Sequence, residues 1–105
     1  MLTRAEILAR KTGRDKATLP DGSQVAIRGL TRDEIIEMQE IEDLAAKDNF
    51  IIATGMTDPK MNTDDVAVWG AQADAGDLVA VSEAIQHLSG LGKGAGKSRV
   101  DASGG

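Results

Sequence analysis

The segment GKGAGKS, residues 92–98, contains the pattern in this chain that comes nearest to a nucleotide-binding motif. Glycines followed by Lys97 and Ser98 are typical of the end of a Walker A loop, where backbone amides and a lysine bind phosphates. The full motif requires a glycine at position 91, and the chain has Leu91 there. A Walker A loop also joins a buried strand to a helix, whereas a helical pattern precedes these glycines and only RVDASGG follows them. These mismatches favour a non-catalytic tail, and a nucleotide-binding protein remains a remote alternative.

The other reactive side chains do not form a catalytic or metal-binding pattern. His87 is the single histidine and the chain has no cysteine, so a closed zinc site is not expected. The acids Asp64, Asp65, Asp74 and Asp77 lack the spacing of a calcium-binding loop. Their positions favour helix caps and first turns instead. No serine lies in a G-x-S-x-G motif. We therefore expect no enzyme activity, no cofactor and no metal.

The composition restricts the class of protein further. A chain of 105 residues forms one small domain, and its net charge of −5 argues against binding to nucleic acid. No run approaches the roughly 18 apolar residues that span a bilayer, and the first residues are too polar for a secretory leader. We expect a protein that binds neither nucleic acid nor membrane.

Two motifs outline the N-terminal third of the chain. Thr3 and Glu6 have the spacing of a capping box, which predicts a helix that ends near Gly13. The turn PDGS, residues 20–23, then separates two stretches in which apolar residues occupy alternate positions. These residues are Ala17, Leu19, Val25 and Ile27. The pattern predicts a β-hairpin with one apolar face.

The rest of the chain has a helical period. A second capping box at Thr31 and Glu34 precedes an apolar stripe that predicts one helix of about four turns. The stripe consists of Ile35, Met38, Ile41, Leu44 and Ala45. Three further helices are predicted: two turns over residues 50–56 capped by Asp48 or Asn49, a short helix over 63–69, and a closing helix that ends at Gly90. The fold class is therefore α+β, a small mainly helical domain of four to five helices with one N-terminal β-hairpin.

The composition changes after Gly90. Six of the 12 glycines lie in residues 90–105, together with three basic residues and one acid. We predict a domain over residues 1–90 and a flexible glycine-rich tail over residues 91–105.

Four large side chains are candidates for partner binding. Met adapts to varied surfaces and Trp supplies a large contact area. The candidates are Met38, Met56, Met61 and Trp69. The alternative is that they fill a core that has one Phe and no Tyr.

The order of these motifs resembles the tail assembly chaperones of bacteriophages with long non-contractile tails, and of related prophages. The resemblance rests on the PDGS hairpin with Val25 and Ile27 and on the segment GLTRDE, residues 29–34. It also rests on TDP at 57–59, DDV at 64–66, and the closing AIQHLSG at 84–90. It covers nearly the whole chain.

The resemblance implies a non-catalytic protein that binds the tape-measure protein and keeps it soluble while tail-tube subunits polymerise. Such a protein acts in the host cell cytoplasm and is absent from the mature virion. Further partners that we consider are a tail-tube subunit, a frameshifted longer form of the chain and a second copy in a homo-oligomer. In the family the frameshift site lies near the end of the shorter reading frame, and Gly92-Lys93 and Gly96-Lys97 can both be encoded by slippery codons. The alternative is a structural tail or head-tail component of the particle.

Overall fold

The computed structural model describes residues 1–91, so the predicted tail lies outside the described residues except for Leu91. Within them the chain forms five helices and three strands, which confirms the α+β, mainly helical class. The helices are α1 (Arg4–Leu8), α2 (Arg32–Gln39), α3 (Leu44–Gly55), α4 (Thr63–Gln72) and α5 (Ala75–Leu88). The strands are β1 (Arg14–Thr18), β2 (Gln24–Arg28) and β3 (Met56–Asp58), in the sheet order β1-β2-β3.

The predicted hairpin is confirmed. Strands β1 and β2 pair antiparallel, with Ala17 opposite Val25. Gly22 has a φ of 93°, which a glycine adopts without steric cost and which closes the turn. Ala17 and Ile27 are each 2% exposed, so the alternating face is the buried one. The third strand, β3, follows α3 without a loop and is too short to show a period in the sequence.

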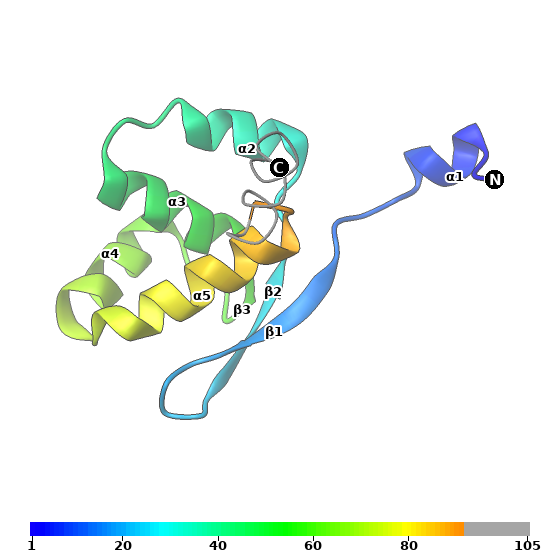
Figure 1. Cartoon of the computed structure of the whole chain (residues 1–105). Helices are drawn as coiled ribbons and strands as arrows, with labels where there is room; N and C mark the ends of the chain where they lie inside the picture. Colours follow the sequence, from blue (N-terminus) through cyan, green and yellow to red (C-terminus); the bar gives the residue numbers. More distant parts are fainter. Residues whose placement is uncertain (92–105) are drawn as a thin grey trace, which may run out of the picture.

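Helix α5 packs across β1 and β2, and α3 lies beside α5 (Figure 1). Helices α2 and α4 pack on either side of α3. The largest fully buried side chains come from β2, α3, β3, α4 and α5, so the core lies where these elements meet. They are Ile27, Ile52, Met56, Val66, Val81 and Ile85. The predicted apolar face of the closing helix, with Val81 and Ile85, is thus confirmed.

The prediction of one helix through Ala45 is wrong, because the chain turns between α2 and α3. The amides of Glu40 and Ile41 donate to carbonyls three residues earlier, which tightens and ends α2. Asp43 then caps α3, since its Oδ2 accepts from the Ala46 amide at 2.8 Å. The caps predicted at Asp48 or Asn49 are therefore wrong too. Leu44, predicted as part of a buried stripe, is 79% exposed.

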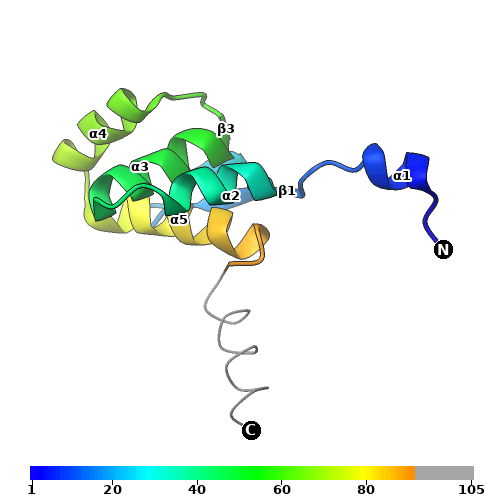
Figure 2. The ribbon, with the colours of Figure 1, turned by 90° about the horizontal axis from the view of Figure 1, so that it is seen from above.

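Helix α1 is also shorter than predicted. Its capping box forms as expected, but the helix ends at Leu8 and none of its residues is buried. Figures 1 and 2 both show it projecting from the body. A helix this short needs packing to extend. Gly13, the predicted end, instead lies against the closing helix, where an added Cβ would come within 3.2 Å of Leu88 Cδ1.

Candidate functional site

An apolar hollow of about 470 Å³ opens between α3, α4 and α5. It is lined by small residues of α3 and α4, by Asp48 and Asn49, and by Leu78 and Val79 of α5. The small residues are Ala45, Ala67, Gly70 and Ala71. Small walls let a partner approach the helix backbones closely, so the hollow can accept a large apolar side chain.

A second hollow, of about 480 Å³, continues from the first along α3. It is lined mainly by Met38, Leu44, Ala45, Lys47, Asp48 and Ile51. Ala45 and Asp48 line both hollows. The two therefore form one continuous surface, which we call the α3 groove.

A polar network holds Asp48 at the junction of the two hollows. The Ser82 hydroxyl donates to Asp48 Oδ1, and Gln86 Nε2 donates to Ser82 Oγ at 2.9 Å. Ser82 is only 3% exposed, so this network fixes a carboxylate on a mainly apolar surface. The network leaves Asp48 Oδ2 without a hydrogen-bond partner among residues 1–91. An amide or basic group of a partner can therefore bind there.

Exposed apolar side chains extend the groove. Leu44 is 79% exposed and Val79 is 48% exposed, and each lines one of the hollows. Large apolar groups that remain in contact with water next to an apolar hollow are typical of protein-binding surfaces. The part of the chain that forms the groove is strongly acidic, because residues 33–91 contain 13 Asp and Glu and two Lys, of which Lys47 lines the second hollow. The groove thus suits a partner that is both apolar and basic.

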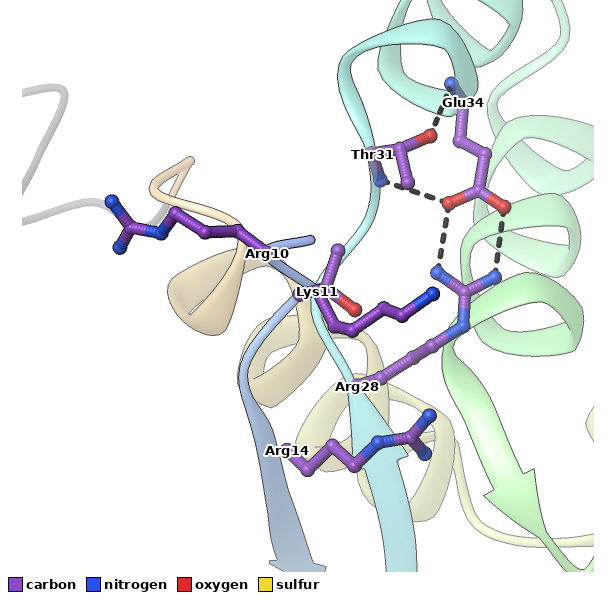
Figure 3. Close-up of a pocket in the computed structure, with 7 residues that line it drawn as sticks. Arg10, Lys11, Arg14, Arg28, Thr31 and Glu34 are labelled. Carbon is purple, nitrogen blue, oxygen red and sulfur yellow. Dashed lines mark hydrogen bonds and ion pairs between the residues drawn. The ribbon is translucent and has the colours of Figure 1, made fainter. Parts of the chain in front are cut away.

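A second feature is a basic cleft of about 510 Å³ at the start of the hairpin (Figure 3). Four cations line it: Arg10, Lys11, Arg14 and Arg28. Arg28 binds Glu34 through two contacts of 2.8 Å. No other ion pair forms within the described part of the chain. Arg10, Lys11 and Arg14 are therefore available to a negatively charged group.

The Arg28–Glu34 pair ties the hairpin to α2. Hydrogen bonds from Arg28 and from the Thr31 amide lower the pKa of Glu34 to about 2, against an ordinary value of 4.5. The bond to Glu34 in turn raises the pKa of Arg28. Glu34 therefore serves the N-cap of α2 and the arginine at once. Arg28 therefore has a structural role, whereas Arg10, Lys11 and Arg14 form no ion pair within residues 1–91.

The four predicted partner-binding residues lie at different depths. Met38 lines the α3 groove but is 7% exposed, and Met56 is 1% exposed within the core. Met61 and Trp69 are half-buried and pack against the core from outside. The structure thus brings one of the four, Met38, to the groove. Their binding roles stay predictions.

The residues of the groove and the cleft were not singled out from the sequence as binding residues, apart from Met38. One signal was present: residues 1–32 contain seven Lys and Arg against three Asp and Glu, the reverse of the balance that follows. The net charge of the whole chain does not show this difference between its N-terminal part and the rest. Leu44 carried no signal, because its spacing fits a buried stripe equally well.

Two further observations bear on chemistry. Within residues 1–91, no group of three His, Cys, Asp or Glu side chains is placed to hold a metal ion. In the same residues no helix has both the length and the apolar character to cross a membrane. The candidate nucleotide residues Lys97 and Ser98 lie outside the described residues.

Comparison with protein-family models, with curated proteins and with solved structures gives no match for this chain.

Proposed function

We propose that this protein is a non-catalytic phage tail assembly chaperone that binds helical segments of a tape-measure protein in the α3 groove. The observation that carries the proposal is the groove itself, a continuous and mainly apolar surface with Leu44 exposed in one hollow and Val79 in the other. The family resemblance of the sequence supplies the kind of partner.

The geometry favours a helix as the bound element. The groove is bordered by helices and walled by small residues, which suits the helix-in-groove mode, where apolar side chains one turn apart enter successive hollows. Asp48 lies between the two hollows and can accept a hydrogen bond from a Lys or Arg of the bound helix. The acidic body favours the same basic partner and keeps a loaded chaperone soluble.

Further parts of the proposal follow from the resemblance. The protein acts in the host cell cytoplasm and is absent from the mature virion. A tail-tube subunit and a frameshifted longer product are additional partners. Sequencing the codons for Gly92-Lys93 and Gly96-Lys97 tests the last point, since a frameshift there needs a slippery heptamer.

Co-expression with a tape-measure protein tests the proposal. We expect the wild-type chain to raise the soluble yield of the tape measure and to co-purify with it. Leu44→Asp and Val79→Asp should each weaken co-purification about tenfold or more, because each places a charge in an apolar contact. The matched control is Val68→Asp, since Val68 is 55% exposed but does not line the groove.

Two outcomes would overturn the proposal. One is a tape measure whose solubility does not respond to the protein. The other is recovery of the protein from purified particles, which would favour the structural tail or head-tail component instead. Nucleotide binding lost in Lys97→Ala would support the remote alternative.

A further inference from the structure

The N-terminal residues Met1–Lys11, which we call the arm, carry half of the exposed large apolar side chains of the described chain. Eight large apolar side chains are exposed in residues 1–91, and half of them belong to the arm. They are Met1, Leu2, Ile7 and Leu8, at 118%, 50%, 54% and 67% exposure. The arm contains the helix α1, and none of the residues of α1 is buried. Four exposed apolar side chains within eight residues are typical of a segment that binds another protein surface.

The arm is also basic, and a capping box stabilises its helix. It contains Arg4, Arg10 and Lys11 against a single acid, Glu6. That acid is used in the capping box, where Glu6 Oε1 accepts from the Thr3 amide at 3.0 Å and the Glu6 amide donates to Thr3 Oγ1 at 3.1 Å. The box holds the first turn in place, so docking requires less ordering than for an unstructured segment.

The α3 groove has the complementary character. It is mainly apolar and has Asp48 at the junction of its two hollows. It lies on a body with 13 acids and two lysines, of which Lys47 lines the second hollow. The arm thus matches the groove both in apolar surface and in charge. Because α1 projects away from its own body and lies at the opposite end of the molecule from α4 in both views (Figures 1 and 2), we assign the matching groove to a second copy.

We propose that the arm of one copy docks in the α3 groove of a second copy, with Ile7 and Leu8 in the hollows and the basic residues against the acidic body. This inference rests on the proposed function, because it assigns a second occupant to the same groove. The cations at the base of the arm, Arg10 and Lys11, together with Arg14, lie in the basic cleft and have no ion-pair partner within residues 1–91. In the docked state they face the acids of the neighbouring copy.

The arrangement regulates access to the groove. In the absence of a client, neighbouring arms cover the grooves and remove exposed apolar surface from water. A tape-measure helix then has to displace an arm before it binds. Removing the apolar residues of the arm should therefore strengthen client binding while it weakens self-association.

The test uses full-length variants in sedimentation equilibrium, where each variant lacks one half of the contact. Ile7→Asp/Leu8→Asp removes the arm face and Leu44→Asp/Val79→Asp removes the groove face. We expect the wild-type chain to self-associate. Each variant alone should have a dissociation constant for self-association at least about tenfold larger than that of the wild type. A mixture of the two should form a 1:1 heterodimer, because one supplies an intact groove and the other an intact arm. Val68→Asp, the control, should self-associate as the wild type does.

A second measurement keeps the test independent of folding defects. A labelled peptide of residues 1–12 should bind the arm variant, whose groove is intact, and should bind the groove variant at least about tenfold more weakly. Its affinity should fall as salt is raised, since the contact is partly ionic. Circular dichroism spectra of both variants check that they are folded.

The results separate this inference from the proposed function. A wild-type chain that stays monomeric, or a mixture of variants that does not associate, would overturn the arm docking whatever the tape measure does. If the groove variant loses self-association but still solubilises the tape measure, the docking stands and the proposed client site is wrong.

Discussion

Gly55, the last residue of α3, packs directly against Ile85 of α5. A Cβ at this position would come within 2.5 Å of Ile85 Cγ2, 2.8 Å of Cδ1 and 2.9 Å of Cγ1. Ile85 is 0% exposed, so any shift of its side chain has to be accommodated within the core. Gly55→Ala therefore forces α3 and α5 apart, or forces Ile85 out of its rotamer.

The magnitude follows from two opposing terms. Alanine is favoured over glycine in a helix by about 1 kcal/mol, and overpacking a core costs about 1–3 kcal/mol. Three contacts below 3.0 Å with a branched, buried side chain place the overpacking near the upper end. We expect Gly55→Ala to lower the free energy of unfolding by about 1–2 kcal/mol, which corresponds to a fall in Tm of roughly 4–15 °C.

Thermal and urea denaturation followed by circular dichroism measures this change. The control is Gly76→Ala in α5, where the new Cβ would lie 3.5 Å from Pro20 Cγ, an ordinary contact. It should be neutral or stabilising by up to about 1 kcal/mol. In Gly55→Ala/Ile85→Ala the added methyl fills part of the cavity, so the double variant should be more stable than the sum of the single effects by at least about 0.5 kcal/mol. A Gly55→Ala protein as stable as the wild type, or strict additivity, would refute the reasoning.

Three further predictions concern the Glu34 pair, the network under the groove and the core. Because the pKa of Glu34 falls from 4.5 to about 2 on folding, its contribution is complete above pH 4.5 and is lost as the pH falls towards 2. Glu34→Gln should cost about 1–2 kcal/mol at pH 7 after allowance for solvent screening, and urea midpoints of the two proteins should converge near pH 2. Ser82→Ala leaves Asp48 Oδ1 and Gln86 Nε2 without their partner and should cost about 1–3 kcal/mol in urea denaturation; no change would show that water replaces the hydroxyl. Ile52→Ala, at a site with 0% exposure, should cost about 2–5 kcal/mol, and a smaller loss in the same assay would mean that the core collapses around the cavity.

Positive and negative charges are unevenly distributed along the chain. Residues 1–32 carry an excess of four positive charges and residues 33–91 an excess of 11 negative ones, as their counts of seven against three and two against 13 show. Such a separation of charge makes the binding of any charged partner depend on ionic strength. Measurements of binding need a stated salt concentration.

The sequence by itself determined those elements whose signals are local. The capping boxes at Thr3 and Thr31 formed as predicted, and so did the turn at Gly22 with the buried faces of the hairpin and of α5. In each case the hydrogen bonds or the apolar period involve residues within a few positions of one another. These local interactions form in any tertiary arrangement that preserves the helix or hairpin concerned.

Only the tertiary structure decided the positions of Leu44, α1 and the α3 groove. An unbroken helix through Ala45 and a turn capped by Asp43 fit the same apolar spacing, and the packing of α2 beside α3 selects the turn. That turn leaves Leu44 in water and so creates half of the groove. The groove joins side chains that are distant in sequence, Ala45 and Val79 among them. Their proximity depends on how α3, α4 and α5 pack around one core. The apolar period of a single helix does not show which other helix it contacts.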